Sequence, residues 1–377
     1  MRLPHPAHVG RLGIKELWSL RRDPAMLVLI VYIFTIAIYA AATAMPGTLN
    51  KAAIAIVDED ASPLSARIVA SFYPPQFLTP KLITLAEADA GMDAGNYTFV
   101  LDIPPGFQRD VLAGRSPAIQ LNVDATRMSQ AFTGSGYIQQ IVSGEVAEFV
   151  QRARGTASAA PVELVMRNRF NPNLSHEWFG SLMEIINSVT MLSIILTGAA
   201  LIREREHGTI EHLLVMPVTP AEIMLAKVWA MGLVVLAAEA LSLLLIVKGA
   251  LRVPIEGSLP LFMLVTALHL FSTTSMGILL ATIARSMPQF GMLMLLVLLP
   301  LEMLSGGSTP RESMPVLVQY VMLFAPTTHF TAAAQAILYR GAGLAIVWPQ
   351  MLSIVASGAA FFVFALIRFR KAIGQMA

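Results

Sequence analysis

Residues 182–211 read LMEIINSVTMLSIILTGAALIREREHGTIE. The part from Leu182 to Ile202 is almost entirely apolar, and the charges that follow it alternate in sign from Arg203 onward. About 20 apolar residues are enough for a helix to cross the ~30 Å hydrocarbon core of a membrane. This stretch therefore predicts a transmembrane helix that ends in a charged segment at one face of the membrane.

The composition extends this prediction to the whole chain. Of its 377 residues, 55% are hydrophobic and only 13% are charged, whereas soluble domains carry about 25% charged residues. This deficit excludes a soluble enzyme, and the fold class expected is an α-helical polytopic membrane protein with six transmembrane helices. The five further spans are predicted at Ala25–Met45, Met224–Val247, Leu259–Ile283, the short Gln289–Leu304, and Leu344–Ile367.

Basic residues predict the orientation, because lysine and arginine gather on the cytoplasmic side of membrane helices. The N-terminal arm, residues 1–24, is basic and amphipathic. With six spans, the later basic clusters fall on the same side as this arm, which places both termini in the cytoplasm. These clusters contain Arg203 and Arg205, Lys227, Arg285, and Arg368 to Lys371. A cleaved signal peptide is the alternative for the first span, but its apolar run exceeds the about 7–15 residues of such peptides.

The same alternation places the segment from Pro46 to Trp178 outside the membrane. Its pattern predicts a small α/β domain, with an N-cap at Ser62 and Pro63 in the first turn of a helix. The expected strands are Ala52–Val57, Tyr97–Asp102 and Ile119–Val123, and the expected helices run from Pro63 towards Phe72, over Phe107–Ala113 and over Gln130–Arg154.

Between the last two spans, residues 305–310 (SGGSTP) interrupt the helical pattern. The apolar run from Pro315 to Phe324 is too short to cross a membrane, and Pro326–Arg340 is helical in pattern. We expect a re-entrant hairpin on the outer side, with an ordinary external loop as the alternative. The residues assigned to this outer region are Ser305, Gly306, Gly307, Pro310, Glu312 and Pro315.

Two motifs carry a family resemblance. Residues 203–230, REREHGTIEHLLVMPVTPAEIMLAKVWA, and residues 304–315, LSGGSTPRESMP, resemble signatures of ABC-2-type transporter permeases. The order of segments along the chain, with one span, a large external domain and then five spans, also resembles that family. Within the family the chain looks most like the bacterial inner-membrane export permeases that work with a membrane-fusion adaptor. The resemblance implies a cytoplasmic arm (1–24), a first transmembrane helix (25–45), a periplasmic α/β domain (46–178) and a five-helix transmembrane domain (179–377).

In that family the charged segment after the second span couples the permease to its motor, so the resemblance implies a coupling segment over residues 203–220. A short polar helix lying along the membrane and seated in an ATPase could transmit force, whereas the plain alternative is a charged stop-transfer loop. We expect the N-terminal arm either to lie at the headgroup surface or to cover the ATPase contact. The coupling residues expected are Arg203, Glu204, Arg205, Glu206, His207, Gly208, Thr209, Glu211 and Pro217.

The chain contains no G-x-x-x-x-G-K-[ST] phosphate loop. The resemblance therefore implies that this chain binds no cofactor and that ATP and Mg²⁺ belong to a separate ABC ATPase subunit. The other partners expected are a second permease copy or a related permease, a periplasmic adaptor protein and membrane lipid. Nucleic acid is not expected, because the net charge is only +2.

No catalytic or metal site is predicted. The sequence H-G-T-I-E-H over residues 207–212 has one residue too many for the inverted zinc motif H-x-x-E-H, and cysteine is absent. Charged residues inside membrane spans are costly, which makes Glu239 and Glu302 candidate intramembrane polar sites. An ion-coupled secondary transporter and a membrane scaffold without transport remain alternatives to the export permease.

Overall fold

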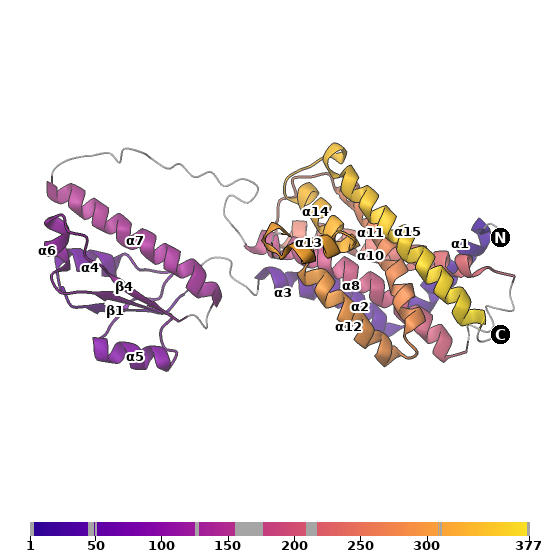
Figure 1. The fold of residues 1–377 in the computed structure, drawn as a ribbon, viewed down its shortest axis with the longest axis horizontal. Coiled ribbons are helices and arrows are strands. Elements are labelled where there is room, and N and C mark those ends of the chain that lie inside the picture. Colours follow the sequence, from indigo (N-terminus) through magenta and orange to yellow (C-terminus); the bar gives the residue numbers. More distant parts are fainter. Residues whose placement is uncertain are drawn as a thin grey trace. The chain divides into compact units, whose positions relative to one another are not determined.

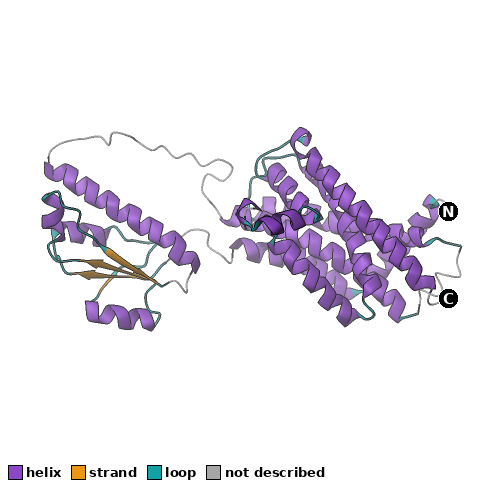
Figure 2. Cartoon of the chain, viewed as in Figure 1, coloured by secondary structure: helices purple, strands orange, loops and turns teal. Residues whose placement is uncertain are grey.

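The computed structural model describes residues 4–43, 49, 51–124, 128–154, 176–208, 217–307, 309 and 311–374. The chain forms two compact units, of which one joins residues 1–45 to 176–377 and the other covers residues 46–175. Figure 2 shows that the first unit is helical and that the described strands belong to the second. This agrees with the predicted alternation of membrane helices with one inserted α/β segment.

The helices of the first unit follow the apolar runs of the sequence. They are α1 (Pro6–Arg21), α2 (Pro24–Tyr32), η1 (Ile33–Ala37), α3 (Ile38–Thr43), α8 (His176–Glu206), α10 (Pro220–Ser242), η2 (Leu243–Ala250), α11 (Leu259–Ile283), α12 (Met287–Met303), η3 (Arg311–Ser313), α13 (Val316–Met322), α14 (Pro326–Leu338) and α15 (Leu344–Gly374). Helices α2, η1 and α3 form one continuous apolar segment, and so do α10 and η2.

Within the described residues, five helical segments are long and apolar enough to span a membrane: 24–43, 177–206, 220–250, 259–283 and 344–371. Helix α12, the predicted fifth span, has only 17 residues, or about 26 Å at 1.5 Å per residue. Helices α13 and α14 bend by 88° and would add one span if they crossed together. The chain is therefore a polytopic helical membrane protein with five or six candidate spans.

Helices α8 and α11 form the centre of the bundle. Helix α11 packs against α8, α10, α14 and α15, and α8 also contacts α3 and α12. Helix α15, in contrast, lies at the periphery of the bundle, and most of its apolar surface is exposed. Leu352, Phe364 and Ile367 are examples of these exposed side chains. Exposed apolar side chains of this kind suit contact with lipid or with another membrane helix.

The second unit is built on a four-stranded sheet in the order β2-β1-β3-β4. Strand β1 pairs in parallel with both β2 and β3, and β3 pairs antiparallel with β4. The elements are β1 (Ile54–Asp58), α4 (Pro63–Ala70), β2 (Lys81–Leu82), α5 (Leu85–Asp93), β3 (Phe99–Ile103), α6 (Phe107–Leu112), β4 (Gln120–Val123) and α7 (Met128–Arg154). Figure 1 shows α4, α6 and α7 over one face of the sheet and α5 over the other.

Alternation along the strands explains these two layers. Ile56 and Leu101, which are paired across β1 and β3, belong to the core under α4, α6 and α7. Their neighbours Val57 and Val100 belong to the smaller core under α5. Because successive side chains of a strand point to opposite faces, a strand that is apolar at every position is covered on both sides.

The three expected strands and the three expected helices of this domain are confirmed to within a few residues. The Ser62 cap is also confirmed, since its hydroxyl accepts a hydrogen bond from the backbone N–H of Ser65 at 3.1 Å. Strand β2 and helix α5 were not predicted from the sequence. Strand β2 has two exposed residues, and α5 packs through small residues such as Ala88, so neither produces a strong apolar pattern.

Candidate functional site

Helix α8 ends in four consecutive charged residues, each of which contacts a different part of the bundle. Arg203 forms an ion pair with Asp23, the N-cap residue of α2. Arg205 donates hydrogen bonds to the carbonyl oxygens of Ala281, at 3.1 Å, and Ala284, at 2.9 Å. These carbonyls lie at the C-terminal end of α11, where a cation also interacts favourably with the helix dipole.

The two glutamates complete this arrangement. Glu206 accepts a hydrogen bond at 2.9 Å from the backbone N–H of Met287, at the start of α12, where a carboxylate suits the positive end of the helix dipole. Glu204 accepts a hydrogen bond at 2.5 Å from Lys15 of α1 and lies 2.7 Å from the ammonium of Lys227 on α10. The polar end of α8, residues 203–206, is thus tied to five other helices.

Lys227 is the buried centre of a cluster of four charges. Its side chain is 1% exposed, and its ammonium lies 3.0 Å from Glu16 in addition to its contact with Glu204. Lys15 lies 3.5 Å from Glu16, so two lysines balance two glutamates. Burying an ion is costly unless it is paired, and this pairing allows α1, α8 and α10 to meet without a net buried charge.

Lys15, which is on α1 outside the spans, has a raised pKa. Burial acts to lower the pKa of Lys15, but the attraction and hydrogen bonds of Glu204 and Glu16 outweigh it and raise the value above 10.5. Lys15 is therefore protonated throughout the physiological pH range.

Two further contacts hold α1 against α10. Glu222 accepts a hydrogen bond at 2.7 Å from the backbone N–H of His5, and it also closes a capping box with Thr219 at the start of α10. The indole N–H of Trp229 donates to the carbonyl oxygen of Val9 at 3.1 Å. The N-terminal arm is therefore docked along α10 through specific polar contacts.

The position of residues 203–206 corrects one expectation. We expected a separate helix along the membrane from Arg203 onward, but these residues are the last turn of α8. The reason is that each charge has a partner on a neighbouring helix, so the span helix can continue to Glu206. Gly208 follows with φ +67°, a left-handed conformation that ends helices and favours glycine.

The remaining coupling residues are only partly described. His207 and Pro217 are exposed, and the ring Nδ1 of His207 lies 2.9 Å from the carbonyl oxygen of Arg203. Thr209 and Glu211 lie outside the described residues. His207 and Pro217 are therefore exposed on either side of residues 209–216, which lie outside the described residues.

The sequence reasoning missed the partners of this site. Lys15 and Lys227 served only as cytoplasmic charges in the orientation argument, and Glu16 and Asp23 were not assigned a role. A signal was present, because a lysine eight residues into an apolar helix requires a buried acidic partner. No rule of sequence spacing identifies Glu16 or Glu204 as that partner, because both lie on other helices.

A second polar cluster lies inside the bundle. Glu239 is fully buried, and its carboxylate accepts a hydrogen bond at 3.1 Å from Thr266 of α11. On the same helix, His269 stacks on Phe330 with ring centroids 4.0 Å apart, and its Nε2 lies 2.9 Å from the hydroxyl of Thr190. Glu239 therefore faces the interior of the bundle and links α10 to α11.

The other intramembrane candidate, Glu302, lies at the end of α12. The hydroxyl of Ser305 donates to the backbone carbonyl oxygen of Glu302 at 2.8 Å. Gly306 adopts φ +93°, and a Cβ at Gly307 would come within 2.1 Å of the Met183 side chain on α8. The glycines thus allow a tight turn that packs on α8.

The rest of the predicted outer region begins a new helix. Pro315 is the N-cap residue of α13, while Pro310 and the side chain of Glu312 lie outside the described residues. Among the side chains that are described, no group of three or more histidines, aspartates and glutamates is placed to hold a metal ion.

Known proteins identify the family. The model of the ABC-2 family transporter proteins matches residues 25–367. The inner membrane transport permease YhhJ of Escherichia coli K12 is 66% identical over 373 residues, which cover 99% of this chain and 100% of that protein. The probable multidrug ABC transporter permeases YbhR and YbhS of the same strain are 31% and 26% identical, over 95% and 94% of this chain and 97% and 94% of their own lengths. This multi-pass inner-membrane chain therefore belongs to the ABC-2 family and is a transmembrane transport permease.

Proposed function

We propose that this chain is the membrane subunit of an ATP-driven exporter and that a separate ABC ATPase supplies the energy. The family match carries the proposal, and the polar end of α8 supports it. This single turn contacts α1, α2, α10, α11 and α12. A force applied beside it would therefore act on most of the bundle at once.

The motor would engage the exposed residues next to this turn. His207 and Pro217 border residues 209–216, which carry the family motif. We assign the contact with the ATPase to this segment, including Thr209 and Glu211. We assign a positioning role to the four charges that precede it, residues 203–206. The chain itself would bind neither ATP nor Mg²⁺, because its sequence lacks a phosphate loop.

The remaining assignments follow from the family and the orientation. Two permease subunits, identical or related, would form the pathway between them, since α15 leaves an apolar face open. Both termini would be cytoplasmic, and residues 46–175 would form a periplasmic domain able to dock an adaptor protein. Helices α13 and α14, bent by 88°, would form the outer re-entrant hairpin.

The names given to YbhR and YbhS suggest a substrate class. Both are described as probable multidrug permeases, and we extend this to the present chain as export of amphiphilic small molecules. The exposed apolar faces of the bundle would allow such molecules to enter from the membrane.

Affinity purification from cell membranes, followed by mass spectrometry and an ATPase assay, tests this proposal. We expect an ABC ATPase in stoichiometric amount, and ATP-dependent uptake of a lipophilic dye into inverted vesicles that contain both proteins. His207→Ala with Pro217→Ala should reduce ATPase recovery, whereas exposed Lys248→Ala, at the other end of the α10–η2 segment, should not. Glu204 is avoided because its substitution would disturb the bundle itself.

Two results would refute the proposal. Dye uptake driven by an ion gradient, with no ATPase recovered in any detergent, would identify a secondary transporter. The absence of both an ATPase partner and transport would favour a scaffold.

A further inference from the structure

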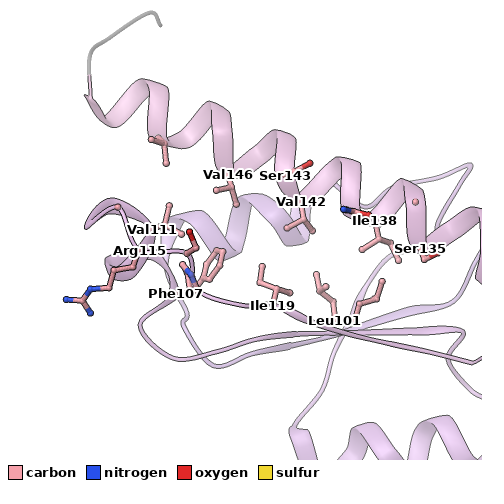
Figure 3. A pocket seen from close by; sticks show the side chains of 17 residues that line it. Leu101, Phe107, Val111, Arg115, Ile119, Ser135, Ile138, Val142, Ser143 and Val146 are labelled. Atoms are coloured by element: carbon pink, nitrogen blue, oxygen red, sulfur yellow. The ribbon is translucent and has the colours of Figure 1, made fainter. Parts of the chain in front are cut away.

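The α/β domain contains a cavity of about 830 Å³ between α7, α6 and the sheet. In Figure 3, Ile138, Val142 and Val146 point down from α7 towards Phe107, Ile119 and Leu101. Sites for small ligands commonly have volumes of about 300–1,000 Å³, so this cavity has the size of a ligand site.

The lining is apolar in the middle and polar without charge at its edge. Besides the valines and isoleucines, the cavity is bordered by Ser116, Ser135, Gln139 and Ser143. The one charged lining residue, Arg115, already binds Asp110 at 3.1 Å on the exposed surface. This arrangement suits a ligand with an apolar body and a neutral hydrogen-bonding group, and it offers no unpaired charge to an ionic ligand.

The sequence of α7 explains why the space exists. At Gly134 the helix lies directly on the sheet, because a Cβ there would come within 2.2 Å of the Phe99 ring. Ile138, one turn later, is 1% exposed and still fills the core. The residues that follow on the same face are Val142, Ser143 and Val146, whose side chains are smaller than those of leucine or phenylalanine.

An open apolar cavity is unfavourable, because its walls lose packing contacts and stay in contact with water. Core packing would favour larger side chains at these positions. A helix that packs tightly at one end and presents small side chains over a cavity further along is the arrangement that a ligand site requires.

We propose that this cavity binds a neutral amphiphilic small molecule, with its apolar part between α7 and strands β3 and β4 and its polar group at the serine and glutamine edge. Such a molecule could be a membrane-derived lipid with one acyl chain or a compound in transit. The inference needs no ATPase, so it stands or falls separately from the function proposed above.

The absence of cysteine from the chain allows a direct test. Val142→Cys places a thiol in the cavity, and Ala147→Cys places one on the exposed face of the same helix. The full chain in lipid nanodiscs is alkylated with a maleimide in the presence of monodecanoylglycerol, N-phenyl-1-naphthylamine, decanoate or dodecyltrimethylammonium. At about ten times its Kd, a neutral probe should slow labelling at position 142 about tenfold, since only the free fraction reacts.

Labelling at position 147 should not change, and the two charged probes should protect position 142 less than the neutral ones. Protection by the glycerolipid alone assigns the site to lipids, and protection by the naphthylamine alone assigns it to aromatic compounds in transit. Either result supports the proposal.

Filling the cavity provides the matched control. Val146→Trp, or the milder Val146→Phe if the tryptophan variant fails to fold, should abolish protection at position 142, whereas Ala147→Phe should leave it intact. The proposal is overturned if neither neutral probe protects position 142, if both positions are protected equally, or if protection survives in a folded cavity-filled variant.

Discussion

Replacing Lys227 with methionine tests whether the buried charge cluster holds α1 to the bundle. Methionine preserves the long apolar part of the side chain but removes the ammonium that lies 3.0 Å from Glu16 and 2.7 Å from Glu204. Lys15 would then face two carboxylates alone. The variant therefore introduces an uncompensated negative charge into a site where Lys227 is 1% exposed.

Breaking a buried ion pair by removing one partner costs about 3–5 kcal/mol. We expect the lower end, about 3 kcal/mol, because Lys15 remains 2.5 Å from Glu204 and is itself half-exposed, which allows water to screen the excess charge. The same reasoning predicts the sign of a second substitution. Adding Glu16→Gln restores one lysine to one glutamate, so the double variant should recover about 1–2 kcal/mol, a coupling of the size found for residues in one network.

Equilibrium unfolding of the purified chain in mild detergent, followed by tryptophan fluorescence, measures these differences. Lys248→Met serves as the control, because Lys248 is exposed on η2 of the same helical segment and its loss should change stability by less than about 0.5 kcal/mol. If Glu16→Gln makes the Lys227→Met variant less stable instead of more stable, the charge-balance argument is refuted.

Three other substitutions test separate parts of the structure. Arg67 forms an ion pair with Glu145 at 2.7 Å, and this hydrogen-bonded pair lowers the pKa of Glu145 below 4.5. The stability that the pair contributes should be complete above pH 4.5 and be lost as the pH falls through the lowered pKa. Thermal melts of Glu145→Gln should lack this pH-dependent part of the stability. Arg205→Ala should cost about 1.5–3 kcal/mol in detergent unfolding, because two carbonyl acceptors of α11 lose a charged donor. Glu239→Gln keeps an acceptor for Thr266 and should retain dye export, whereas Glu239→Leu should lower stability by about 1–3 kcal/mol; normal export and stability in the leucine variant would contradict the assigned role.

The bundle could be predicted because its helices follow a local rule. Each apolar run of about 20 residues identifies a helix without reference to the others, and the strands with apolar residues at every position were recognisable in the same way. Strand β2 escaped because its two exposed residues exist as a strand only through pairing with β1. The short α12 shows the limit of the rule, because a helix of 17 residues does not reveal its depth in the membrane.

The sequence singled out residues 203–206 but did not predict their contacts. Alternating charges after a span identified residues 203–206, yet the same pattern suits an exposed helix and a buried junction equally well. The difference lies in Lys15, Glu16 and Lys227. Lys15 is 189 residues from Glu204 in the sequence, and these side chains become neighbours only when α1 folds onto α10. Partners of this kind follow from tertiary packing and not from spacing.

The contacts made by the polar end of α8, residues 203–206, also limit how a motor could act. If an ATPase engages the segment after Gly208 as proposed, its force reaches the bundle through the last turn of α8. Arg203, Glu204, Arg205 and Glu206 each hold a different helix, so this turn cannot tilt without either moving those helices or breaking a charged contact. Breaking the buried contact between Glu204 and Lys227 costs several kcal/mol, whereas moving the packed helices together preserves all four contacts. Rigid displacement of α8 together with α1, α2, α10, α11 and α12 is therefore the motion that this structure favours.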